Sequence, residues 1–185
     1  MWMPAGTNAE ERTGVKMEFL DLARNRYSER SFAATPLEEE KLYKILEEGR
    51  IAPTACNNQP QRFYVLKSEE ARAKAAKLTY TYNAPVVVLV CYLTAEAWHS
   101  PFDGFCSGDM DASIAASSMM FEAEDLGVHS IWLRGFDSVN VQEAFDLPGG
   151  TVPSLMLALG YPGENAKPHT LHAQREPIEE FVVEL

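Results

Sequence analysis

The chain has 185 residues, 46% of them hydrophobic and 23% charged, with a formal net charge of −11 at pH 7. This length favours one domain with a sizeable core. The acidic balance argues against a general binder of nucleic acid or of anionic membranes. Basic residues that cluster against such a background therefore stand out.

Cysteine and histidine usage bears on metal sites and on the cellular compartment. The three cysteines form no CxxC pair and the four histidines are widely spread, so no zinc-ligand pattern is present and we expect no metal. The odd cysteine count and the lack of a signal-peptide pattern favour a reducing cytoplasm. The longest apolar run, residues 84–93, is too short to span a membrane and predicts a buried strand.

The first elements are predicted in chain order as follows. Residues 1–16 are polar and are expected to form a loosely ordered extension, with a single domain over 17–185. Periodicity predicts a helix over 17–25 and a loop over 26–32. The next helix is expected to begin at Thr35 as N-cap, with Pro36 first and Glu38 completing a capping box, and to end near Gly49.

The remaining pattern alternates strands and helices. Strands are predicted over 63–66, 84–93, 129–133 and 155–159, with helices over 68–78, 108–126 and 138–145, where Ser68 and Ser138 are the expected caps. The 108–126 helix is apolar on most sides, which indicates burial in the centre or in a subunit interface. This order indicates an α+β or α/β sandwich.

Arg26, Ser28 and Arg30 alternate in a short extended or turn segment. Alternation sends their side chains to one side, where two guanidinium groups and a hydroxyl suit phosphate oxygens. The alternative is a solvated loop that pairs with Glu29, Glu38 and Glu39.

Two further segments carry candidate binding groups. Asn57 and Gln59 can donate and accept, so they suit the imide edge of a flavin-like ring; alternatively, their amides cap their own loop. In residues 132–136, Gly135 relieves side-chain bulk where backbone N–H groups can face a ligand; alternatively, this is a simple strand-to-loop turn.

The joint order of these segments resembles the FMN-binding nitroreductase family over nearly the whole chain after Met17. The motifs are RxSxRxF, AP[ST]AxNxQPxxF, NAPVVVLV, DxSIAxSxMxxxAxxLG, a [CS]xWxxGF-like strand, LGYP and RxPxEEF. They occupy residues 26–32, 52–63, 83–90, 111–127, 130–136, 159–162 and 175–181.

The resemblance implies an α+β sandwich with a central mixed sheet flanked by helices, assembled as an intertwined homodimer with FMN at the interface. It implies that Arg26, Ser28 and Arg30 hold the flavin's phosphate, ribityl chain and pyrimidine edge, and that Arg175 is a second phosphate-binding arginine.

The other implied FMN-binding positions are of two kinds. A loop that reaches across from the partner subunit contains Pro53, Thr54 and Asn57, and we count Gln59 with it. The strip under the isoalloxazine ring contains Trp132, Leu133, Arg134 and Gly135. Many relatives carry a glycine or an acidic residue in place of Arg134. Three roles of its side chain stay open: contact with the phosphate of NADPH, contact with an acidic substrate, or exposure to solvent.

The activity implied is ping-pong transfer of electrons from NAD(P)H through FMN to a nitroaromatic, quinone or similar small acceptor. The flavin carries this chemistry, so no catalytic side chain is named. The alternatives are a specialised flavin enzyme of the same fold and a non-catalytic FMN-binding protein.

Overall fold

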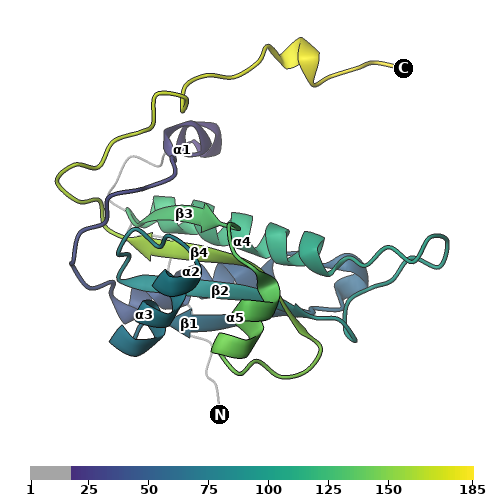
Figure 1. Cartoon of the computed structure of the whole chain (residues 1–185). Coiled ribbons are helices and arrows are strands. Elements are labelled where there is room, and N and C mark those ends of the chain that lie inside the picture. The colour runs from purple at the N-terminus through teal and green to yellow at the C-terminus, as the bar shows by residue number, and fades with distance from the viewer. Residues whose placement is uncertain (1–17) are drawn as a thin grey trace, which may run out of the picture.

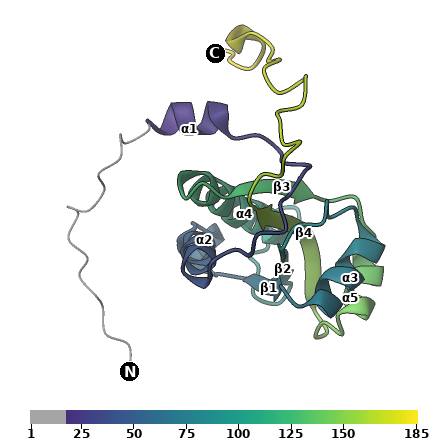
Figure 2. The same cartoon turned by 90° about the vertical axis from the view of Figure 1, so that its left-hand side faces the viewer.

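The computed structural model describes residues 18–185, and the extension predicted for 1–16 lies outside them. The sheet has four strands, β1 (Gln61–Leu66), β2 (Val86–Leu93), β3 (His129–Leu133) and β4 (Thr151–Gly160). Their spatial order is β1-β2-β4-β3, so β1 and β3 are the two edges. Helices cover both faces, which gives the α+β sandwich that was expected (Figures 1 and 2).

Alternation along β2 explains its unbroken apolar sequence. Val86, Val88 and Val90 pack in one core with α2 (Glu39–Ile51) and α4 (Gly108–Asp125). Val87, Leu89 and Cys91 pack in a second core with α3 (Glu69–Leu78) and α5 (Ser138–Ala144). Both faces of the strand are therefore shielded from water, as predicted for residues 84–93.

The expectation of a mixed sheet is wrong for these strands, because all three strand pairs are antiparallel. A strand that is covered on both faces has a continuous apolar sequence in a parallel and in an antiparallel sheet. The sequence therefore does not indicate the direction of strand pairing. The one parallel contact recorded within residues 18–185 is the isolated bridge between Ser28 and Ser130.

The predicted start of the second helix is also wrong. Helix α2 begins at Glu39, and its N-cap residue Glu38 makes no capping hydrogen bond. The Glu38 carboxylate instead accepts a hydrogen bond from the Tyr161 hydroxyl. The preceding Leu37 is buried in the core, and residues 35–38 remain outside the helix.

Gly49 does not end that helix, which continues to Ile51. A Cβ atom at Gly49 would lie 2.9 Å from Met119 Cε and from Phe63 Cζ. The glycine therefore permits close packing of α2 against α4 and β1.

The other helix starts are nearly as predicted. Ser68 caps α3 by accepting from the Ala71 N–H. The cap of α5 is Asp137 rather than Ser138, because the Asp137 carboxylate accepts from the Val139 and Asn140 N–H groups. Short elements complete the fold: α1 (Phe19–Asn25) and the 3-10 turns η1 (Ala55–Asn57) and η2 (Ile178–Glu180). Within residues 18–185, no helix combines the length and apolar character needed to cross a membrane.

Candidate functional site

The segment that follows α1 lies against the edge strand β3. Ser28 bridges Ser130, and the Glu29 N–H donates to the Ser130 carbonyl at 3.0 Å. Held in this way, the segment turns Arg26, Ser28 and Arg30 toward a common cleft, as the alternation predicted. The intervening Glu29 is buried on the other side.

The cleft has a volume of about 350 Å³ and two walls that are far apart in sequence. One wall is the segment after α1, and the other is the C-terminal tail, which passes beside α1 in both views (Figures 1 and 2). The structure thus brings the predicted Arg175 together with the predicted Arg26, Ser28 and Arg30. The lining residues are Arg26, Tyr27, Ser28, Arg30, His169, Leu171, His172 and Arg175.

The arginines of this cleft form no salt bridge in the described chain, although the charge of Arg26 acts on the Glu124 carboxylate. The ion pairs recorded among residues 18–185 include none of Arg26, Arg30 and Arg175. Arg30 donates to the Ser28 carbonyl at 3.1 Å, and Arg175 donates to the His172 carbonyl at 2.6 Å.

The alternative of a solvated, acid-paired loop therefore does not hold. Of the three carboxylates proposed as partners, Glu39 pairs with Lys67, Glu38 bonds Tyr161, and Glu29 points away from the cleft. Three guanidinium groups around a small cavity form an anion-binding donor set.

Tyr27, which lines the cleft, and Glu124, which interacts with Arg26, have shifted pKa values. Burial, followed by the hydrogen bond to Glu29, raises the pKa of Tyr27 to about 12. Burial also raises the pKa of Glu124 on α4, although the charges of His129 and Arg26 oppose this effect.

The strip 132–135 lies at the far end of β3 from the Ser28 bridge. Leu133 is buried, whereas Arg134 and Gly135 are exposed. Four residues of extended chain separate Ser130 from Arg134, which corresponds to about 13 Å. A Cβ atom at Gly135 would meet nothing within 4 Å, so the space in front of this backbone is open.

The Arg134 side chain folds back along its own strand end. Its guanidinium donates to the Phe136 carbonyl at 3.2 Å and to Ser138 Oγ at 3.3 Å, and lies 4.9 Å from the centre of the Phe136 ring. It is thus held on the exposed surface beside Gly135.

The loop containing Pro53, Thr54, Asn57 and Gln59 is ordered by its own hydrogen bonds. The Gln59 N–H donates to Thr54 Oγ1 at 3.1 Å, and Gln59 Nε2 donates to the Asn57 carbonyl at 3.3 Å. Asn57 and Gln59 adopt φ values of 55° and 53°, which L-residues rarely do. The capping alternative therefore holds for the Gln59 side chain.

Within one chain, this loop does not meet the cationic cleft. The loop precedes β1 at the end where Gln61 pairs with Tyr92, whereas Ser130 pairs with Leu159 at the opposite end and on the opposite edge. Crossing the eight residues of β2 alone spans roughly 24 Å. The sequence prediction assigned this loop to the partner's site, and its position leaves that assignment open.

Sequence reasoning missed several residues at the cleft, namely Tyr27, Glu29, His129, His169 and His172. Glu29 occupies an alternate position of the RxSxR motif, which alternation places opposite the arginines, whereas Tyr27 lines the cleft despite its alternate position. His169 and His172 stand six and three residues before Arg175, so their closeness to the predicted phosphate-binding arginine in the sequence was the signal that could have identified them.

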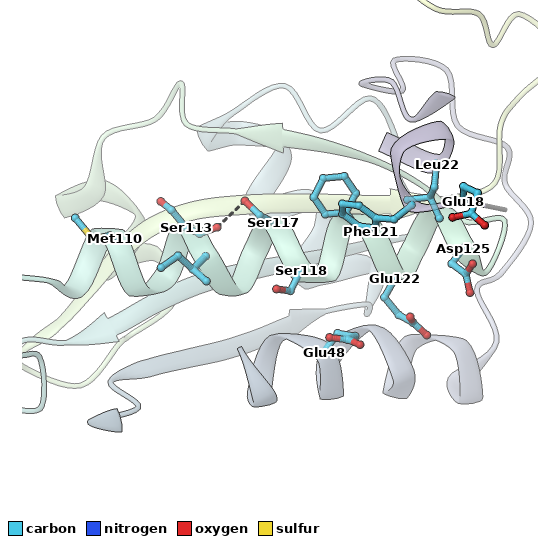
Figure 3. Close-up of a pocket in the computed structure, with 12 residues that line it drawn as sticks. Glu18, Leu22, Glu48, Met110, Ser113, Ser117, Ser118, Phe121, Glu122 and Asp125 are labelled. Atoms are coloured by element: carbon cyan, nitrogen blue, oxygen red, sulfur yellow. Dashed lines mark hydrogen bonds between the residues drawn. The ribbon is translucent and has the colours of Figure 1, made fainter. Parts of the chain in front are cut away.

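A second and larger groove runs along the outer side of α4, between α1 and α2 (Figure 3). It has a volume of about 800 Å³. Met110, Ile114 and Phe121 give it apolar surface, and Ser113, Ser117 and Ser118 lie along its floor. The helix predicted to be apolar on most sides is thus buried toward the sheet and open on this one.

No cluster of three or more histidine, cysteine, aspartate or glutamate side chains able to hold a metal ion is found in residues 18–185. The donor set of the cleft consists of cations and hydroxyls, which are ligands for an anion.

The chain is similar to several known proteins in sequence and in fold. The model of the nitroreductase family matches residues 23–85 and 77–161. A nitroreductase family protein from Clostridium difficile 630 is 38% identical, with a TM-score of 0.86 over 90% of this chain and 98% of that one. A protein from Desulfovibrio desulfuricans crystallised in complex with FMN is 25% identical, with a TM-score of 0.77 over 92% of this chain and 98% of that one. An NADPH-dependent oxidoreductase from Staphylococcus saprophyticus is 25% identical over 84% of this chain and 72% of its own length.

Proposed function

The chain belongs to the nitroreductase family, and we propose that it binds FMN and uses NAD(P)H to reduce nitroaromatic, quinone or similar electron-poor acceptors by a ping-pong mechanism. The family and the names of the relatives make it an NAD(P)H-dependent oxidoreductase. FMN, when bound, supplies the redox chemistry. The protein's own residues bind and orient the partners.

The observation that carries this proposal is the cationic cleft. Arg26, Arg30 and Arg175 converge from two distant segments and form no salt bridge within residues 18–185, in a chain of net charge −11. Such a concentration of unpaired guanidinium groups fits a terminal phosphate, with the Ser28 hydroxyl as a further donor. A compact arginine cluster of this kind suits one terminal phosphate, which favours FMN over FAD.

The strip at the end of β3 suits the ring system. Its exposed backbone at Arg134 and Gly135 lies one strand length from the cleft and has open space before it. Backbone N–H groups there can donate hydrogen bonds to the heteroatoms of a flat ring, and Gly135 leaves room for close approach.

We assign the α4 groove to a second copy of this chain. Met110 and Ile114 are 55% and 36% exposed there, and the serines along the groove let another helix approach closely. The tail beyond residue 177 carries further exposed apolar side chains and projects away from the sheet (Figure 1). A two-fold dimer would also provide each cationic cleft with an Asn57 loop from the partner, which the chain's own loop does not supply.

Turnover tests the proposed activity. Protein loaded with FMN is expected to oxidise NADH or NADPH in the steady state when menadione or a nitrofuran is present, with the parallel double-reciprocal plots of a ping-pong reaction. Retention of FMN without acceptor-dependent oxidation would indicate a non-catalytic flavin-binding protein.

Sedimentation tests the dimer. FMN-loaded protein is expected to sediment as a dimer at micromolar concentration. Ile114→Lys places a charge in the α4 groove and should shift the protein toward monomers, because a buried unpaired charge is costly. Val139→Lys is the matched control, since Val139 is 62% exposed on α5, on the other face of the sheet. A well-folded, FMN-loaded wild-type monomer would contradict the assignment.

A further inference from the structure

A carboxylate is buried directly behind the cationic cleft. Glu29 is 1% exposed although it stands between the cleft residues Ser28 and Arg30. One of its oxygens, Oε1, accepts from the N–H groups of Arg30 at 2.9 Å and Ser31 at 2.8 Å. The other, Oε2, accepts from the Tyr27 hydroxyl at 2.9 Å and faces His129 Nδ1 at 3.1 Å. These four contacts offset the cost of removing the charge from water.

Each of these partners belongs to a part of the molecule that shapes the cleft. The Arg30 and Ser31 amides fix the backbone turn that aims the Arg30 side chain. His129 is the first residue of β3, so its contact ties that turn to the sheet. The turn is therefore held from inside rather than by the ligand.

The fourth partner, Tyr27, extends the contact to the C-terminal tail. Its ring packs edge-on against His129 at 5.1 Å and against His172 at 6.1 Å between centroids. His172 Nε2 in turn lies 3.0 Å from the Arg24 carbonyl. The Tyr27 hydroxyl is protonated at neutral pH and donates to Glu29, and burial together with this hydrogen bond raises its pKa to about 12.

We propose that Glu29 is the positioning residue of the phosphate cleft, and that its carboxylate holds the Arg26–Arg30 turn and, through Tyr27 and His172, the tail that carries Arg175. The inference rests on the proposed FMN function. A negative charge next to an anion site would otherwise weaken it. The Glu29 carboxylate, however, is engaged by its four partners and faces away from the cleft.

The test compares FMN with riboflavin, which lacks the phosphate. Apoprotein is titrated with each flavin and the quenching of flavin fluorescence is followed. Glu29→Gln keeps the size of the side chain but removes its charge and one oxygen acceptor. The Kd for FMN should rise about tenfold, whereas the Kd for riboflavin should stay within about twofold, because only the phosphate needs the aligned cations.

Tyr27→Phe provides a milder variant that keeps the ring contacts and removes only the hydroxyl. It should raise the Kd for FMN about threefold or more and spare riboflavin. Matched controls are Glu38→Gln, which removes the charge from a similar tyrosine–glutamate hydrogen bond outside the cleft, and Tyr161→Phe, which removes that bond. Both controls should leave the two affinities unchanged.

The outcomes separate this inference from the function on which it rests. A wild-type protein that binds neither flavin, or binds both equally, overturns the phosphate cleft itself and the Glu29 role with it. A wild type that prefers FMN, with the same preference in Glu29→Gln and Tyr27→Phe, overturns the Glu29 role alone. Equal weakening of both flavins in the two variants does so as well, because it is the signature of a merely structural residue.

Discussion

Ser28 and Ser130 are joined by an isolated parallel bridge, which fixes the cationic segment to the first positions of the edge strand β3. The segment is short and has no regular secondary structure of its own, so this bridge and the Glu29–Ser130 hydrogen bond give it a defined direction. The arginines on either side of Ser28 are thereby presented to one cleft together with the tail.

Loss of either arginine in this segment should weaken FMN binding. Arg26→Ala and Arg30→Ala each remove charge-assisted hydrogen bonds that contribute about 1.5–3 kcal/mol when partly desolvated, or about a ten- to hundredfold change in Kd. Arg175→Ala should cost less, because the exposed tail that carries it is held by fewer contacts. Fluorescence titration measures all three. Near-wild-type affinity in the Arg26/Arg30 double variant would mean that the phosphate lies elsewhere.

Arg134 is expected to influence nicotinamide choice and not flavin retention. Within the described residues its side chain contacts Phe136 and Ser138, outside the cationic cleft, so Arg134→Ala should leave FMN content unchanged. Since the guanidinium lies on the exposed surface beside Gly135, its loss should lower kcat/KM for NADPH about tenfold and affect NADH less. Equal effects on both nicotinamides would remove the phosphate-binding role.

Glu124 supplies a pH test of stability. Its pKa is raised by burial, and its Oε2 atom is buried with no hydrogen-bond partner among residues 18–185. The folded state therefore favours the protonated acid, so the stabilisation by protonation is present below the unfolded pKa and is lost as pH rises through the folded pKa.

Replacing the Glu124 carboxylate with a neutral amide should accordingly stabilise the folded state at neutral pH. Glu124→Gln should raise the free energy of unfolding at pH 7 by up to about 1 kcal/mol, and the gain should vanish below about pH 4. Glu47→Gln is a control of opposite sign, because the hydrogen bond from Arg50 lowers the Glu47 pKa. Thermal unfolding across this pH range measures both, and a gain for Glu124→Gln that is independent of pH would refute the assignment.

Gly108, at the start of α4, tolerates no side chain. A Cβ atom there would lie 2.1 Å from Tyr92 Cδ2, in a rigid ring on β2. Gly108→Ala should therefore destabilise the fold by about 1–3 kcal/mol through overpacking. Gly149→Ala is the matched control, since nothing lies within 4 Å of its Cβ position. Equal unfolding midpoints in urea for the two variants would show that α4 can shift away from the ring.

Local patterns accounted for most of the fold. The strand β3 and the helices α3 and α4 lie within a residue or two of the predicted ranges, because caps and apolar periodicity mark them. The predicted start of α2 was wrong because the burial of Leu37 overrode a plausible capping box. The prediction of a mixed sheet was wrong because residues 84–93 are apolar on both faces, and that pattern does not indicate whether strands pair in parallel or antiparallel.

The candidate site was predictable only in part. Alternation placed Arg26, Ser28 and Arg30 on one side, and the family resemblance singled out Arg175. Nothing local indicated that the tail would bring His172 against Tyr27, or that Glu29 would be buried with His129, since these contacts join residues about a hundred or more positions apart. Long-range packing of this kind is not encoded in a short window of sequence.

The identity of the bound cofactor tests the central claim most directly. Mass spectrometry of the flavin released from purified protein, after incubation with equal amounts of FMN and FAD and removal of the unbound excess, should find FMN as the main species at about one per chain. A cleft that fits a single terminal phosphate requires this result. FAD as the main species, or no retained flavin, would contradict the account.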